Sequence, residues 1–292
     1  MIIEIKDLHK AELFVGIFQH IRQFTEYVNL MFEDDRFYMQ SMDSSKVIIF
    51  EIILPSEWFC SYQLPTGPKV IGINSILFFK VLNAREKTQT IQIEFSEDNN
   101  DKLQMHFFME KSTEKSVASG ANTPSVFDKH FELPLIEVEA DLLNIPHIDH
   151  QAEFSLNSGT FANLVNQLKN FGDTMQIKCS EDKIELFSFS IDSGKMFAEI
   201  PIEELTEFAI TEGDVLNISF SLKYLHDICL YQKINKEVEI KISDNFPMVV
   251  VYRLGPAMSS SDSSEEEAGE NEEEKKRKDP QICFYLAPKM DD

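Results

Sequence analysis

The second half of the chain repeats the hydrophobic pattern of the first half, and this duplication limits the possible folds more than any other feature. When the sequence is shifted by 147 positions, a helical face and a hairpin match without a gap. Phe14 falls on Phe161, Phe18 on Val165, Ile21 on Leu168, Phe24 on Phe171, Val28 on Met175, Leu30 on Ile177 and Phe37 on Ile184. At a slightly different shift, Asn74–Leu82 falls on Asn217–Leu225, which places Lys80 on Lys223. Because self-similarity at a fixed period reports architecture, we expect two similar domains.

Each half combines helical and strand patterns. Ala11–Phe24 places its apolar residues on one helical face, and Asn74–Leu82 predicts a second, shorter helix. The patterns of Val28–Met39, Val47–Leu54 and residues 90–109 are those of strands and hairpins, with turn-forming residues between apolar runs. The sequence therefore predicts an α+β fold of two similar domains built from antiparallel sheets and helices.

The two domains are predicted to be joined by a connector. Residues 135–151 lack a strong periodic pattern, so we expect an N-terminal domain over residues 1–134 and a C-terminal domain over residues 152–292. One stretch of the second domain, about residues 259–279, carries nine acids, four bases and a single apolar residue. Such a composition cannot bury enough apolar surface to offset the entropy of ordering, so we expect a disordered acidic insertion there. Residues 111–126 predict a long surface loop.

Composition narrows the class of protein further. The formal net charge is −23, which taken alone argues against nucleic acid as a partner, although the local positions of charges decide such binding. No stretch approaches the ~18 uncharged apolar residues that a membrane span needs, and the chain begins without a secretory pattern, so we expect a soluble intracellular protein that does not bind membranes. The four cysteines are far apart in sequence, without the spacing of a zinc site or a redox C-x-x-C pair, and predict buried thiols. They are Cys60, Cys179, Cys229 and Cys283.

Four short motifs carry a resemblance to a known family. They are MQSMDSSKV at 39–47, LLNIP at 142–146, DNFPMVVVY at 244–252 and YLAPKMDD at 285–292. In this order they resemble the eukaryotic-type proliferating cell nuclear antigen family, over essentially the whole chain apart from the two predicted loops. The resemblance implies a sliding-clamp ring of three identical subunits, with helices lining the hole and sheets outside. It also implies that strands near Lys195–Pro201 and Val126–Leu133 of neighbouring subunits pair.

The same resemblance implies a function. Members of this family encircle duplex DNA without reading its sequence, are opened by a clamp loader, and tether DNA polymerase and other replication and repair enzymes. They catalyse nothing and need no cofactor. We therefore expect a processivity factor of DNA replication and DNA repair in the nucleus, or at the site of replication if the protein is viral.

Five basic residues are expected to face the DNA by this resemblance. They are Arg22, Lys80, Lys169, Lys223 and Lys233, on the predicted helices 12–23, 74–83, 158–170 and 221–233. The same helices hold two acids, Glu12 and Asp227, so bases are relatively concentrated there in an acidic chain. A few such contacts suit weak, sequence-independent sliding. The alternative is that these are ordinary solvated helix faces, and neutral residues at Val15, Gly16, Asn163 and Asn166 stand where relatives tend to carry bases.

A socket for partner peptides is the second implied site. Family members bind motifs of the form Q-x-x-[ILM]-x-x-[FY]-[FY] beneath the connector. By motif match the socket would comprise Met42, Leu143, Ile145, Pro247, Tyr285, Ala287 and Pro288. A flexible methionine, branched aliphatics and an aromatic make an adaptable apolar surface. The alternative is that these residues pack in the core.

Two other classes of function remain open from the sequence. A subunit of a checkpoint-type heterotrimeric clamp or a viral processivity factor would share the fold, but such proteins usually lose the connector socket and the Y-L-A-P-K end. A metal-dependent nuclease would need the carboxylate pairs Asp34–Asp35, Glu97–Asp98 or Asp291–Asp292 as ligands, whereas such pairs are usually solvated turn residues. His147 and His150 lack further ligands near them in sequence.

The acidic insertion gives the first testable prediction. Replacement of residues 259–279 by a short Gly-Ser linker should leave the melting temperature and the trimer unchanged, because a segment of this composition packs against nothing. Calorimetry and native mass measurement check this, and a clear drop in melting temperature would show that the segment packs.

Overall fold

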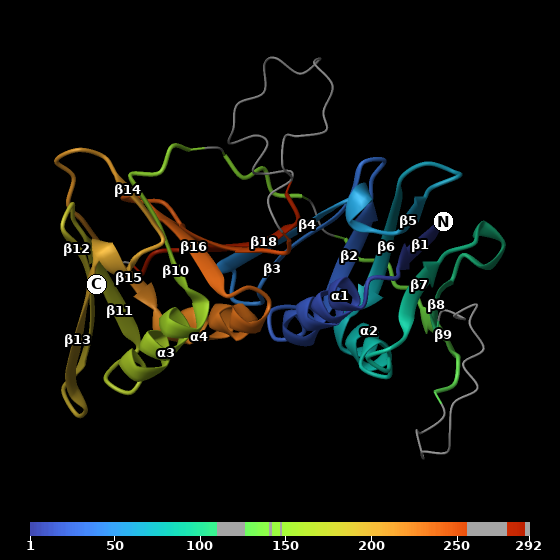
Figure 1. The fold of residues 1–292 in the computed structure, drawn as a ribbon, viewed down its shortest axis with the longest axis horizontal. Helices are drawn as coiled ribbons and strands as arrows, with labels where there is room; N and C mark the ends of the chain where they lie inside the picture. Colours follow the sequence, from blue (N-terminus) through green and yellow to red (C-terminus); the bar gives the residue numbers. More distant parts are fainter. Residues whose placement is uncertain (110–125, 140–141, 147, 256–278, 290–292) are drawn as a thin grey trace, which may run out of the picture. The chain divides into compact units, whose positions relative to one another are not determined.

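The chain forms two units, and the computed structural model describes all residues except 110–125, 140–141, 147, 256–278 and 290–292 (Figure 1). Unit 1 comprises Met1–Arg22, Glu26–Met39 and Leu54–Ala140. Unit 2 comprises Gln23–Thr25, Gln40–Ile53 and Asp141–Asp292. A short segment and a hairpin from the first half of the sequence thus belong to unit 2.

Unit 1 contains two helices and two sets of antiparallel strands. Its elements are β1 (Ile2–Ile5), α1 (Leu8–Ile21), β2 (Tyr27–Phe32), the first residues of β3 (Arg36–Met42), β5 (Ser61–Gln63), β6 (Lys69–Asn74), α2 (Ser75–Leu82), β7 (Thr90–Glu94), β8 (Lys102–Phe108) and β9 (Lys129–Pro134). One sheet runs in the order β5-β1-β7-β8-β9, and the start of β3 pairs with β2, which pairs with β6. The two helices lie side by side (Figure 1).

Local signals explain why the helices of unit 1 begin where they do. The Asp7 side chain accepts a hydrogen bond of 2.9 Å from the Lys10 amide at the start of α1, and the Asn74 side chain accepts one of 2.9 Å from the Leu77 amide at the start of α2. Such caps satisfy amides that the first helical turn leaves without partners. Rings on the two helices then meet, with Phe18 and Phe78 centroids 4.6 Å apart. This aromatic contact holds the helix pair together.

Unit 2 has the same kinds of element. They are the last residues of β3, most of β4 (Ile48–Pro55), β10 (Ala152–Asn157), α3 (Ser158–Leu168), β11 (Thr174–Cys179), β12 (Lys183–Ser190), β13 (Gly194–Pro201), β14 (Glu207–Ile210), β15 (Leu216–Ser221), α4 (Leu222–Cys229), β16 (Glu237–Ile242), β17 (Met248–Arg253) and β18 (Gln281–Leu286). One set of strands runs in the order β14-β10-β16-β17-β18-β4, and a separate sheet runs in the order β13-β12-β11-β15. Helices α3 and α4 also lie side by side (Figure 1).

The duplication predicted from the sequence is present in the structure. Strand β2 shifted by 147 residues coincides with β11, β6 coincides with β15, and α2 coincides with α4. The predicted match of Asn74–Leu82 with Asn217–Leu225 is therefore wrong. The residue equivalent to Asn74 is Ser221, which precedes α4, so Lys80 corresponds to Asp227 instead of Lys223.

Strands β18 and β4 pair antiparallel within unit 2. The register places Phe284 opposite Phe50 and Tyr285 opposite Ile49. Phe24 packs against this junction, with ring centroids 5.7 Å from Phe50 and 5.6 Å from Phe284. The sequence prediction placed Phe24 in the first helix. That is wrong, because α1 ends at Ile21 and the three residues after Arg22 belong to unit 2.

The predicted loops lie mostly outside the described residues. This holds for residues 111–125 of the predicted surface loop and for residues 259–278 of the acidic insertion. Asp279, the last residue of the predicted insertion, is described, and it corrects that boundary. It is buried, and a carboxylate oxygen lies 3.4 Å from a guanidinium nitrogen of Arg253. A replacement of the insertion should therefore end at Lys278 so that this ion pair stays intact.

Strands β9 and β13 each lie at the end of a sheet among the strands that the structure describes. These are the strands that the sequence predicts to pair between subunits. Edge strands present unpaired backbone N–H and C=O groups and associate readily with other edges.

No helix among the described residues is long and apolar enough to cross a membrane.

This arrangement predicts how a proline would act on β13. Ala198→Pro removes a backbone donor and constrains the edge strand, so it should convert the trimer to monomers while the circular dichroism spectrum stays largely native. Ala209→Pro places the same change on β14, another strand at the end of its sheet, and should leave the trimer intact. Native mass measurement of both variants distinguishes the two edges. A fully trimeric Ala198→Pro variant would exclude β13 as the interface.

Candidate functional site

A buried aspartate shapes the turn that follows β3 and carries Met42. Oδ1 of Asp43 accepts hydrogen bonds of 2.7 Å from the amides of Val47 and Ile48, and Oδ2 accepts one of 2.9 Å from the amide of Ser45. Aspartate is suited to this because its short side chain mimics a backbone turn. In the QSMDSS motif, Asp43 therefore has a structural role, and it fixes the position of the neighbouring Met42.

A glutamine on β3 holds the connector. The side-chain amide of Gln40 donates to the carbonyl oxygen of Leu143 at 2.9 Å, and its oxygen accepts from the Leu143 amide at 2.7 Å. This pair of bonds imitates one step of a β-ladder between residues 103 positions apart. Gln40 is buried, whereas the Leu143 side chain is exposed. The connector at Leu143 is thus fixed by its backbone, and its side chain is left accessible.

A glutamate on β4 connects the Gln40–Leu143 hydrogen bonds to Tyr285. Oε1 of Glu51 accepts a hydrogen bond of 3.2 Å from Gln40, and Oε2 accepts one of 2.8 Å from the Tyr285 hydroxyl. The Tyr285 ring packs against a buried apolar cluster of Val249, Val251 and Cys283. Tyr285 is half-buried, so its ring has an accessible part and a fixed orientation. Sequence reasoning gave no role to Gln40, although it is the first residue of the QSMDSS motif, and it missed Glu51 on β4.

The remaining members of the predicted socket lie at the ends of paired strands. Met248 and Leu286 form the last pair between β17 and β18, so Pro247 and Ala287 stand immediately beyond that pair. The Ala287 amide donates a hydrogen bond of 3.0 Å to the Val47 carbonyl, which brings the C-terminal segment to the turn after Met42.

The structure therefore brings together most of the predicted socket. Met42, Leu143, Tyr285 and Ala287 are connected through the backbone and polar contacts above, all within unit 2. Pro288 follows Ala287 and is half-buried, and Pro247 is exposed. Ile145 lies two residues after Leu143 and is half-buried. That these seven side chains receive a peptide stays a prediction.

The five predicted DNA-facing bases are all exposed and lie on or beside helices. Arg22 and Lys169 follow the last residues of α1 and α3, Lys80 lies in α2, Lys223 lies in α4, and Lys233 ends the short 3-10 helix Leu230–Lys233. The Arg22 guanidinium lies 4.9 Å from the centroid of the Phe79 ring, so part of its charge is engaged within unit 1.

One acid accompanies the bases of unit 2. Burial raises the pKa of the Asp227 carboxyl, while the positive charges of His226, Lys169 and Lys223 act in the opposite direction. Lys169 caps α3 and Lys223 lies in α4, and these two helices lie side by side in unit 2. The His226 ring also contacts Asn166, with Nδ1 2.7 Å from Oδ1. The surface thus combines two lysines with amide groups.

Those residues of the proposed nuclease set that the structure describes show no metal-binding arrangement. Among the described residues, no group of three or more histidine, cysteine or acidic side chains could hold a metal ion. Glu97 is instead bound to Lys69 at 2.8 Å, which lowers the pKa of its carboxyl. His147 and Asp291–Asp292 lie outside the described residues.

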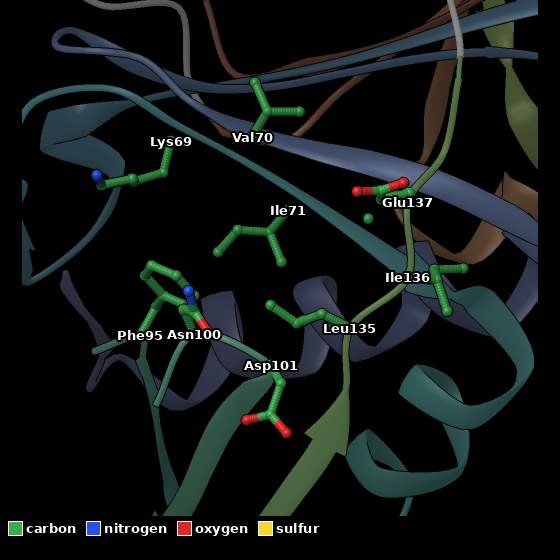
Figure 2. A pocket seen from close by; sticks show the side chains of 10 residues that line it. Lys69, Val70, Ile71, Phe95, Asn100, Asp101, Leu135, Ile136 and Glu137 are labelled. Carbon is green, nitrogen blue, oxygen red and sulfur yellow. The ribbon is translucent and has the colours of Figure 1, made fainter. Parts of the chain in front are cut away.

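A hollow of about 310 Å³ lies in unit 1. Figure 2 shows Ile71, Leu135 and Asp101 around it, with Val70 toward the top of the view and Glu137 toward the right. The Ile136 amide donates a hydrogen bond of 3.0 Å to the Gly72 carbonyl, and this close approach leaves no room for a Cβ at Gly72. None of the seven predicted socket residues lines this hollow.

Comparisons with known proteins agree with the resemblance seen in the motifs. Residues 2–141 match the family model described as proliferating cell nuclear antigen, N-terminal domain, and residues 144–260 match the corresponding C-terminal domain. The chain is also similar to the proliferating cell nuclear antigen of Chaetomium thermophilum. The two are 23% identical over 290 residues, covering 98% of this chain and 97% of the relative.

Proposed function

Because the chain belongs to the proliferating cell nuclear antigen family and is a DNA sliding clamp, we propose that three identical copies close into a ring that holds polymerases on duplex DNA. The mechanism is topological and needs no catalysis. A closed ring cannot leave the duplex sideways, so it slides along it. An enzyme tethered to the ring stays at high effective concentration near the primer end. We further propose that the protein acts in the nucleus and is opened by a clamp loader.

The pair of hydrogen bonds that holds the connector at Leu143 is the single observation that best supports the partner-binding part of this proposal. Gln40 fixes the backbone at Leu143 and leaves the Leu143 side chain exposed. Glu51 fixes the Tyr285 hydroxyl in the same network. A preorganised apolar surface costs less to order when a peptide binds. It suits a partner motif Q-x-x-[ILM]-x-x-[FY]-[FY], which offers one aliphatic and two aromatic side chains.

The exposed bases support the proposal that duplex DNA passes along the helices. Their number is small, which suits a ring that must slide and therefore needs weak contacts with phosphates. A clamp that travels along any sequence requires no readout of base edges.

The rival functions receive no comparable support. A checkpoint-type or viral clamp usually loses the Y-L-A-P-K end, whereas here Tyr285 and Ala287 are fixed by hydrogen bonds to neighbouring elements. Measurement of the mass of the purified chain alone tests this point. A trimer agrees with the proposal, and a monomer that assembles only with other proteins contradicts it.

The socket predicts a loss of peptide binding without loss of the ring. Ile145→Ala together with Tyr285→Ala should weaken a Q-x-x-L-x-x-F-F peptide by roughly ten- to a thousandfold, because interface anchors cost on the order of 1–2 kcal/mol each when truncated. Calorimetric titration of the peptide measures this effect. A matched control is Tyr285→Phe, which keeps the ring and removes only the bond to Glu51, and it should retain most of the affinity.

The mass of the double variant shows whether the trimer is intact, and it is needed to interpret the titration. Equal affinity in the native protein and the variant would remove the socket assignment. Loss of the trimer together with peptide binding would show that Ile145 and Tyr285 are core residues.

The exposed bases predict a charge effect on DNA retention. Arg22, Lys80, Lys169 and Lys223 all changed to glutamate should strongly reduce loader-dependent retention on circular DNA, because phosphates would then meet repulsion. Reversal of Lys46, Lys102, Lys178 and Lys236, which lie in turns and on strands, gives the same change of net charge. That control should keep retention near the native level. Equal retention of both variants at low salt would show that the four bases do not face the DNA.

A further inference from the structure

Two histidines face each other on neighbouring strands of unit 1. His106 on β8 is directly opposed to His130 on β9, and the Nδ1 atoms of the two rings lie 2.6 Å apart. The ring centroids are 4.9 Å apart at an interplanar angle of 63°. Alternate residues of β8, among them Met105 and Phe107, are fully buried, so the two imidazoles lie on the other face of the sheet. They form a pair of nitrogen ligands that none of the sites described above uses.

The surroundings of the pair favour uncharged rings. Burial lowers the pKa of the His106 imidazole below its ordinary value of 6.5, and the positive charge of His130 acts in the same direction, whereas Glu94 opposes both. His106 is therefore uncharged at pH 7. Two Nδ1 atoms at this distance cannot both carry a proton, so at least one nitrogen lone pair points at the other ring. Neutral imidazole is the form that binds metal ions.

A carboxylate lies near the second nitrogen of His106. Oε2 of Glu94 on β7 is 3.9 Å from Nε2 of His106, so one ring nitrogen faces the acid and the other faces His130. Histidines that bind metals commonly present their second nitrogen to a carboxylate, which orients the ring and raises its basicity. Glu132, two residues after His130, is instead paired with Lys102 at 2.7 Å. Glu94 is thus the acid that can orient this histidine.

We propose that His106 and His130 bind one divalent transition-metal ion, such as Zn²⁺, between their Nδ1 atoms, with Glu94 orienting His106 and water completing the coordination. Zinc–nitrogen bonds of roughly 2.0–2.1 Å in tetrahedral geometry place the two nitrogens roughly 3.3 Å apart, so the rings must separate by roughly 0.7 Å. His130 is exposed, which leaves room for its ring to turn. Each ring then keeps its single proton on Nε2, so binding needs no other reactant.

The ligand chemistry selects the ion. Imidazole suits Zn²⁺, Cu²⁺ and Ni²⁺, whereas Mg²⁺ and Ca²⁺ prefer oxygen ligands. The site therefore differs from the carboxylate site considered for a nuclease, and two strands of one chain suffice to form it. An ion held there joins β8 to β9, which lies at the end of its sheet among the described strands. Because the ion binds the folded chain, it should stabilise unit 1 by mass action.

Calorimetric titration with Zn²⁺ tests the site in the full chain without an affinity tag. Excess Mg²⁺ is present throughout, because it occupies carboxylates and leaves imidazoles free. The native chain should bind one ion. His106→Gln and His130→Gln should each weaken binding at least about a hundredfold, since the loss of an outer-shell partner alone costs roughly 10- to 100-fold. Glu94→Gln should weaken binding about tenfold. His9→Gln, which removes an exposed histidine from α1, is the matched control and should leave the affinity unchanged.

Spectroscopy and thermal unfolding identify the ligands independently. Electron paramagnetic resonance of the native chain with Cu²⁺ should show coupling to two imidazole nitrogens, and the His130→Gln variant should show one. Zn²⁺ should raise the melting temperature of the native chain but not that of the His130→Gln variant, whose folding circular dichroism verifies. Native Zn²⁺ affinity in that variant, or no binding by the native chain, would overturn the proposal. Loss of binding in a Cys60→Ser variant instead would also overturn it, because the ion would then lie at the exposed cysteine.

Discussion

The pairing of β18 with β4 is the interaction on which the rest of unit 2 depends. It joins a strand near the C-terminus to a strand from the first half of the sequence, and the three rings of Phe24, Phe50 and Phe284 cover one side of it. Full burial of a phenylalanine contributes about 1.5–3 kcal/mol, so this side is a substantial part of the core. The opposite side carries Glu51 and Tyr285, and the same ladder therefore supports the proposed socket.

The predicted socket is held rigid by this ladder and by one glutamine. A connector without regular structure would move freely over the sheet, because loops have few contacts of their own. Gln40 prevents this at Leu143 by satisfying both the amide and the carbonyl of that residue. Glu51 then couples the glutamine to Tyr285. Polar groups beneath an apolar surface thus fix its shape, and the apolar side chains above them are left to bind.

Periodicity revealed the duplication, the four helices and the main hairpins, because helix and strand patterns are local. Periodicity gave wrong predictions where contacts between residues far apart in the sequence determine the structure. Phe24 continues the helical pattern of α1, yet the rings of Phe50 and Phe284 hold it in unit 2. The identities at Asn74 and Lys80 favoured a false alignment of the second helices, because single identities are weaker evidence than helix starts. The roles of Gln40, although it lies in a quoted motif, and of Glu51 could not be predicted, since hydrogen bonds between residues 103 positions apart follow no sequence period.

The charge distribution indicates which interaction must retain such a protein on DNA. Many acids of this chain are paired on its sheets: for example, Glu239 lies between Lys241 and Arg253, whose charges lower the pKa of its carboxyl. The helices offer only a few exposed bases, and one of them, Arg22, is partly engaged with Phe79. Affinity from counterion release rises with the number of phosphates neutralised, so few bases give weak binding that salt easily reverses. Electrostatics can therefore guide a sliding chain, but retention has to come from closure, and the strength of the clamp depends on how firmly one copy holds the next.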